Sequence, residues 1–275
     1  MADIEIRPEQ SIELLKALHI LTRDGKMNQD SRRKLKQVYH LFQFIEPLLQ
    51  QLDQEDKSIS LVDHGAGKSY LGFILYDLFF KKRHDGSVIH SIETRAELVE
   101  SARALAQRLD FEHMRFHHLS VADSITSDLL PPTVDIVTAL HACDTATDDA
   151  ISFALRKQAR FMVLVPCCQA EVAATLKRLK SQSLARDVLT EIWRHPIHTR
   201  EFGSHVTNVL RCLQLEAHGY QVNVTELVGW EHSMKNELII ATYKDLPRQK
   251  AARRLTEVLG TLGLEQMAER YWLAA

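Results

Sequence analysis

The sequence has little cysteine, no long apolar run and no excess of either charge. Its 275 residues include only four cysteines, so a disulfide framework is implausible and a reducing cytoplasm is the expected compartment. No stretch approaches the roughly 18 apolar residues of a membrane span, and the N-terminal MADIEIRPEQ lacks an apolar signal core. The formal net charge of −2 argues against a uniformly basic nucleic-acid binder. We therefore expect a cytoplasmic globular protein without a membrane anchor.

The spacing of apolar residues changes along the chain. Helical spacing prevails before residue 57, where Asp30 or Ser31 is the expected N-cap of a long helix. Short apolar runs then alternate with helical stretches, which predicts βαβ units and a parallel sheet. The last two runs are only nine residues apart, too close for a helical crossover, so they should pair antiparallel. The predicted strands are 58–62, 87–92, 114–119, 134–140, 161–165, 220–227 and 237–243.

This pattern predicts three parts. An N-terminal helical extension (1–56) precedes a central α/β domain (57–246), and a helical tail (247–275) follows. A helical insertion at 170–219 interrupts the central domain. Its His-rich stretch at 193–208 is either a substrate lid or a solvated connector.

The most informative motif is the glycine loop LVDHGAGKSYLGF at 61–73. A strand should end at Asp63, a Gly65-x-Gly67 turn follows, and a helix opens near Ser69. The first N–H groups of such a helix favour a polar or anionic ligand. A plain strand-to-helix turn is the alternative.

Three ligand-binding patterns compete for this loop. A phosphate loop needs glycine at position 62, which is valine, and the dinucleotide fingerprint needs glycine at position 70, which is tyrosine. The acidic-x-Gly-x-Gly loop of class I S-adenosylmethionine (SAM) methyltransferases fits, with Ser69 where a third glycine is often found. SAM is therefore the predicted cofactor.

Two further acids follow the next two predicted strands. Glu93 stands where an acid can accept hydrogen bonds from both ribose hydroxyls. A lone Glu there is more often a surface carboxylate or a helix N-cap partner. In methyltransferases an acid at the place of Asp123 commonly meets the adenine amino group, and a cap for a helix at 124–130 is the equal alternative. The carboxyl ends of parallel strands share one edge of the sheet, so these acids should lie together. The predicted cofactor-binding residues are Asp63, Gly65, Ala66, Gly67, Glu93, Ala122, Asp123 and His141.

Three motifs in order identify a family resemblance. DHGAGK at 63–68, HACDTATD at 141–148 and PCC at 166–168 resemble a branch of the class I, Rossmann-like SAM methyltransferases that includes the glutathione S-transferase C-terminal domain-containing protein. The resemblance covers roughly 57–243, and Asp144 replaces a glycine common in relatives. It implies a seven-stranded doubly wound sheet of order 3-2-1-4-5-7-6 with strand 7 antiparallel. It also implies a methyltransferase activity for the central domain.

His and Cys residues gather after the fourth and fifth predicted strands. Four interpretations stay open: inert packing, positioning of the acceptor with His141 or Asp144 as base, a zinc site, or a covalent cysteine mechanism. Adjacent Cys167 and Cys168 lack the usual spacing of paired zinc ligands, so no metal is predicted. Positioning is favoured, and the predicted catalytic residues are Asp144, His141, Cys167 and Cys168.

Basic residues concentrate in three segments, 23–36, 177–200 and 244–254, each with a net charge of +4. Such clusters either track a nucleic-acid backbone or form the solvated faces of helices. We expect a macromolecular substrate, RNA before protein. The alternative is a SAM-fold module that binds a ligand or partner without chemistry. The sequence gives no indication of the oligomeric state.

Overall fold

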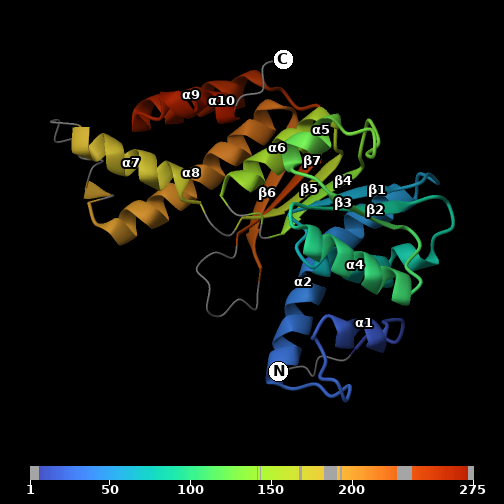
Figure 1. Ribbon diagram of the computed structural model, residues 1–275. Coiled ribbons are helices and arrows are strands. Elements are labelled where there is room, and N and C mark those ends of the chain that lie inside the picture. The colour runs from blue at the N-terminus through green and yellow to red at the C-terminus, as the bar shows by residue number, and fades with distance from the viewer. Residues whose placement is uncertain are drawn as a thin grey trace.

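The computed structural model describes residues 6–140, 142, 144–166, 169–182, 191–192, 194–227 and 237–271. Seven strands form one sheet in the order β3-β2-β1-β4-β5-β7-β6, and helices cover both faces (Figure 1). All neighbouring pairs are parallel except β5–β7 and β7–β6, which are antiparallel. The predicted sheet order and the antiparallel last strand are confirmed. The strands are β1 (Ser60–His64), β2 (Val88–Glu93), β3 (Met114–His118), β4 (Ile136–Leu140), β5 (Phe161–Val165), β6 (Tyr220–Glu226) and β7 (Glu237–Tyr243).

The apolar runs form central strands because successive side chains point to opposite faces. In β5, Phe161 belongs to one core cluster and Met162 to the other, and both are fully buried. One cluster packs against α2 (Gln29–Asp53), α3 (Tyr70–Leu78), η1 (Phe80–Lys82) and α4 (Ala96–Arg108). The other packs against α5 (Val121–Thr126), α6 (Thr145–Arg156) and the end of α8 (Pro196–Ala217). The first strand continues to His64, past the predicted ends at 62 or 63, because Asp63 and His64 still pair with β2.

The N-terminal residues add α1 (Ile12–Ala17) and the long helix α2. The side chain of Asn28 accepts a hydrogen bond from Ser31 N–H at 2.8 Å, so Asn28 is the N-cap of α2 and the prediction of Asp30 or Ser31 was wrong. Asp30 instead pairs with Lys34 at 2.8 Å on the exposed face. Along its second half, α2 buries one stripe against the sheet, formed by Leu41, Phe42, Ile45, Leu49 and Leu52.

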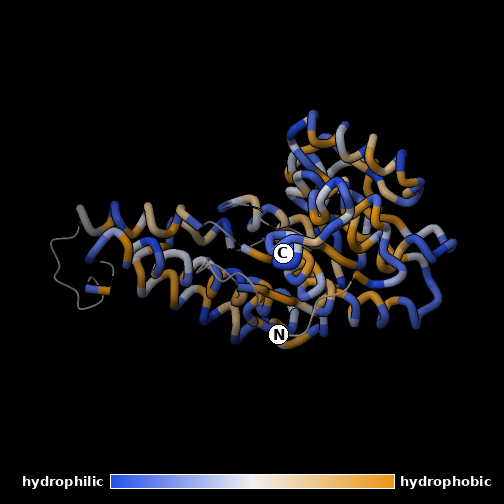
Figure 2. Tube along the Cα trace, turned by 90° about the horizontal axis from the view of Figure 1, so that it is seen from below, coloured by the Kyte–Doolittle hydropathy of each residue, from blue (hydrophilic) through white to orange (hydrophobic). Residues whose placement is uncertain are grey.

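A helical layer lies on the face of the sheet opposite α2. It is formed by helices of the predicted insertion (170–219) and of the predicted C-terminal tail (247–275). It contains α7 (Glu171–Gln182), α8, α9 (Gln249–Leu262), η3 (Glu265–Met267) and α10 (Ala268–Tyr271), which share a third apolar cluster. Figures 1 and 2 show α7 and the first half of α8 extending beyond the sheet as an arm, in which hydrophilic and hydrophobic residues alternate. None of the helices in the described part of the chain has the length and apolar character of a membrane span.

Candidate active site at the carboxyl edge of the sheet

The loop after β1 adopts the backbone conformations that its glycines permit. Gly65 has φ 62° and Gly67 has φ 57°, both in the left-handed region. Ser69, where relatives often carry glycine, also has a positive φ of 56°. Its hydroxyl lies 2.7 Å from that of Ser91, which holds this strained residue in a buried position. The loop is therefore a sharp turn that leaves room beside its backbone.

Asp63 is the fourth residue of β1, and its side chain lies on the face toward α3. It is 2% exposed, and its carboxyl accepts a hydrogen bond from the hydroxyl of Thr138 on β4 at 2.7 Å. Burial raises the pKa of Asp63 to about 7, against a smaller lowering by that hydrogen bond. Asp63 thus braces the base of the loop from inside the protein.

His64 was not a predicted site residue, yet it is the most unusual side chain of the loop. It is fully buried, and neither ring nitrogen has a hydrogen-bond partner among the described residues. Its ring packs edge-on against Phe153 of α6, with centroids 4.4 Å apart. Burial lowers the pKa of His64 to about 3, so the imidazole is neutral at ordinary pH. His64 is the middle residue of the Asp-His-Gly triplet at 63–65, but its place in the motif did not indicate that its side chain is buried.

Glu93 lies at the end of β2, next to the glycine loop as predicted. Its Oε2 accepts the Gly67 N–H at 2.8 Å, and its Oε1 accepts the backbone N–H of Arg95 at 3.0 Å. Burial alone would raise the pKa of Glu93, but hydrogen bonds from Arg95 and Gly67 outweigh it and hold the pKa below its usual value. An ionised acceptor thus stands beside the turn.

Asp123 lies in the first turn of α5, close to the end of β3. The helix begins at Val121 rather than at 124, so the predicted helix boundary was wrong. The cap is Ser120, whose hydroxyl accepts from Asp123 N–H at 3.1 Å and donates to the Asp123 carboxylate at 2.6 Å. Ala122 and Asp123 are both exposed, so a ligand can reach them.

Asp144 joins the loops that follow β4 and β5. Its Oδ1 accepts from Ala170 N–H at 2.9 Å and, at 3.4 Å, from Glu171 N–H, the first residue of α7. Its backbone, at φ 49° and ψ −120°, lies in a region that favours glycine. Strain at this position indicates that the surroundings hold the residue in place, which is common at functional sites.

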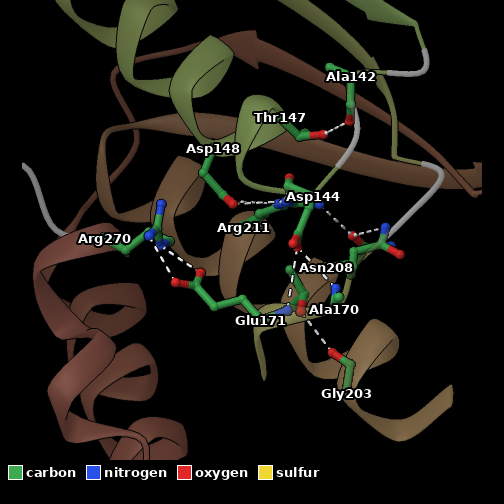
Figure 3. A network of polar contacts seen from close by, with 12 residues as sticks. Ala142, Asp144, Thr147, Asp148, Ala170, Glu171, Gly203, Asn208, Arg211 and Arg270 are labelled. Carbon is green, nitrogen blue, oxygen red and sulfur yellow. Dashed lines mark hydrogen bonds and ion pairs between the residues drawn. The ribbon is translucent and has the colours of Figure 1, made fainter. Parts of the chain in front are cut away.

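A buried polar network supports Asp144 from below (Figure 3). Arg211 of α8 is fully buried and pairs with Asp148 at 2.6 and 2.9 Å, while its Nη2 donates to the Asp144 carbonyl at 2.8 Å. Asn208 accepts from Arg211 and donates to Glu237 at the start of β7. This network connects the β4 loop, α8 and β7, and none of its α8 members was predicted from the sequence.

Four residues of the predicted His/Cys constellation lie outside the described residues: His141, Cys143, Cys167 and Cys168. Their neighbours Ala142 and Pro166 are described. Pro166 lines a narrow cleft together with Gln169, His205, Asn208 and Glu237. The cleft lies at the carboxyl end of β5, which Pro166 follows directly.

A known protein family matches the part of the chain that contains this site. The sequence profile of a methyltransferase domain matches residues 33–175, just over half of the chain. The chain belongs to this methyltransferase family. The match begins within α2 and ends in α7, so it includes the glycine loop, Glu93, Asp123 and Asp144. No curated protein matches the chain in sequence.

Solved structures share the fold at low sequence identity. A Klebsiella pneumoniae protein described as an O-methyltransferase is 14% identical, with 87% of this chain and 92% of that chain covered and a TM-score of 0.50. Magnesium protoporphyrin IX methyltransferase (ChlM) from Synechocystis PCC 6803, solved with bound SAH, is 14% identical over 84% and 94% of the two chains (TM-score 0.48). The N-terminal domain of human METTL16, in complex with SAH, is 10% identical over 75% and 70% (TM-score 0.41).

The edge of the methyltransferase sheet fits SAM. An added Cβ at Gly65 would reach the Ala142 side chain at 3.6 Å, so glycine keeps this gap between the loops open. Beside Gly67, only Arg95 Nη2 lies within 4 Å of such a Cβ in the described part of the chain. Gly65, Ala66 and Gly67 would hold the polar end of the cofactor, and ionised Glu93 suits a ribose diol.

Proposed function

We propose that this methyltransferase transfers a methyl group from SAM to RNA. The observation that carries the substrate class is the arm formed by α7 and the first half of α8. It begins at the active edge, because α7 directly follows the β5 loop, and it presents exposed basic side chains to solvent. These are Lys177, Arg178, Arg194 and Arg200, with His195 and His198 between the last two.

The ion pairs of the arm are exposed, so a polyanion can compete for their basic members. Arg200 pairs with Glu201 and Arg194 with Glu191, but all four side chains are partly or largely exposed. Exposed pairs of this kind contribute about 0–1 kcal/mol, so a phosphate can replace the acidic partner at little cost. The same α8 returns along the sheet and brings Asn208 to the cleft beside Pro166. A strand bound on the arm would therefore lead toward the active edge.

Each residue at the edge has a distinct task in this proposal. When bound, SAM supplies an electrophilic methyl group on its sulfonium. The glycine loop and Glu93 fix the cofactor, and Ala122 and Asp123 border its adenine side. Asp144 accepts a hydrogen bond from the attacking N–H or O–H and so orients the acceptor atom, because methyl transfer gains mainly from orientation. The roles of His141, Cys167 and Cys168 in positioning the acceptor stay predictions from the sequence, because these residues lie outside the described part of the chain.

Methyl-labelled SAM should mark RNA rather than protein when the enzyme is incubated with both fractions of a cell extract. Reversing three arm charges (Lys177→Glu, Arg178→Glu and Arg200→Glu) should weaken RNA binding and reduce its salt slope by about 2, since each phosphate contact to a single strand contributes about 0.7.

The matched control reverses three exposed basic residues outside the clusters, Lys82, Arg108 and Arg115. It should leave RNA binding within about two-fold of wild type. Label appearing only in the protein fraction, or equal RNA binding by the two triple variants, would contradict the RNA assignment.

Substitutions can separate the two roles of Asp144, which are to join the β4 and β5 loops and to orient the acceptor atom. Asp144→Asn keeps an oxygen for Ala170 N–H but replaces the other carboxylate oxygen with a donor. We expect stability within about 1 kcal/mol of wild type and label transfer to RNA reduced about ten- to hundred-fold. Asp144→Ala should lose both stability and rate. Full label transfer by Asp144→Asn would show that Asp144 serves only to join the two loops.

A further inference from the structure

Arg95 covers the carboxylate on which the ribose should bind. It is the N-cap residue of α4, two residues after Glu93. Its Nε donates to Glu93 Oε1 at 3.0 Å, and its Nη2 donates to Glu93 Oε2 at 3.2 Å, a fork-like contact with both oxygens. The same Nη2 is the atom 3.9 Å from a Cβ placed on Gly67. One guanidinium thus lies over both the ribose acceptor and the glycine turn.

The acceptor capacity of Glu93 is fully used in this arrangement. An ionised carboxylate offers about four lone-pair sites. Five donors reach it: the Gly67 N–H, the Arg95 N–H, Arg95 Nε and Nη2, and the Thr94 hydroxyl at 3.3 Å. A ribose diol can therefore bind Glu93 only if existing donors leave.

The donors differ in how easily they leave. The Gly67 and Arg95 N–H groups belong to the backbone of the turn and of the α4 cap, so moving them would deform the loop. The Arg95 side chain is 59% exposed, whereas the Glu93 side chain is 7% exposed. The Thr94 hydroxyl makes the longest contact, at 3.3 Å, and its departure would free one acceptor site on Oε1 only. The guanidinium can swing into water and be resolvated, and its departure frees a site on each oxygen, which makes it the group that yields.

We infer that Arg95 sets the cofactor affinity of this methyltransferase by competing with the ribose hydroxyls for Glu93. The inference rests on the proposed role of Glu93 as ribose acceptor. Binding of the cofactor exchanges one charge-assisted fork for hydrogen bonds to the diol, and Arg95 moves outward. Because the fork is exposed, salt screens it and weakens the competitor.

The test uses calorimetric titration with S-adenosylhomocysteine (SAH), which lacks the sulfonium charge. Arg95→Ala should bind SAH about two- to five-fold more tightly than wild type, the range that an exposed ion pair allows. Arg95→Lys, which keeps the charge but not the fork, should lie between them. Added salt should strengthen SAH binding by wild type and leave Arg95→Ala nearly unchanged.

Two controls separate this inference from the cofactor site itself. Arg108→Ala removes another α4 arginine whose side chain is also 59% exposed, and it should bind SAH as wild type does. Glu93→Ala should bind SAH more weakly. If wild type binds SAH and Arg95→Ala binds it equally or less well, Arg95 is not a competitor. If no variant binds SAH, the proposed cofactor site is wrong and the inference falls with it.

Discussion

Replacing Arg211 with methionine should lower the free energy of unfolding by about 3–5 kcal/mol. Arg211 is fully buried, and its partner Asp148 is only 4% exposed. Methionine fills much of the same space but leaves the Asp148 carboxylate buried without its counter-charge, and it removes the donor to the Asp144 carbonyl. Removing one member of a buried pair is expensive because the remaining charge keeps its desolvation penalty. Urea unfolding at pH 7 measures the loss.

Two companion variants test the cause of this loss. Arg211→Met combined with Asp148→Leu removes both charges and should recover more than half of the stability, since well-packed apolar residues often replace a buried pair without cost. Arg248→Met breaks an exposed pair with Asp245, at side-chain exposures of 53% and 75%, and should cost less than about 1 kcal/mol. A loss below 1 kcal/mol for Arg211→Met would show that the network does not hold the β4 loop.

Much of the fold could be predicted because each strand carries its own pattern. Phe161 and Met162 point to opposite cores, and a run that is apolar at every position fits only a strand covered on both faces. The short connection between residues 227 and 237 fixed the antiparallel β6–β7 pair. Helix boundaries were harder to predict, since Asn28 and Ser120 cap their helices through local side-chain geometry that competes with equally good candidates nearby.

Residues of the candidate site could be predicted only where the residue type and its position at a strand end are enough to indicate a role. Gly65, Gly67 and Glu93 belong to that class, and the structure brings Gly67 and Glu93 into contact across 26 residues. The role of Arg211 could not be seen, because a lone arginine in a helix normally faces water. Arg211 is buried because α8 packs over the β4 loop, and its partner Asp148 is 63 residues away in the sequence. Long-range pairing of this kind leaves no local signal.

The adjacent residues Asp63 and His64 should give stability opposite dependences on pH. The folded-state pKa of Asp63 is raised from 3.8 to about 7, so its contribution is fully present below pH 3.8 and is lost as pH rises to 7. The folded-state pKa of His64 is lowered from 6.5 to about 3, so its contribution is present above pH 6.5 and is lost as pH falls to 3. Between about pH 4 and 6.5 the two slopes cancel.

Single substitutions should uncover each slope. Relative to wild type, Asp63→Asn should become more stable by about 4 kcal/mol as pH rises from 4 to 7, at about 1.36 kcal/mol for each pKa unit. His64→Leu should show the reverse trend. Wild type gains stability from His64 as pH rises from 4 to 7, so the free energy of unfolding of His64→Leu should fall by about 3 kcal/mol relative to that of wild type over this range. An asparagine side chain in place of Asp63 can still accept the Thr138 hydrogen bond, which makes it a fair replacement. Urea unfolding at several pH values gives the free energy of unfolding of each variant minus that of wild type. The contributions of all other titrating groups cancel in this difference. Parallel pH profiles for Asp63→Asn and wild type would show that Asp63 is ionised in the folded protein at pH 5, and a carboxylate that is ionised there must be stabilised by more than the single Thr138 hydroxyl.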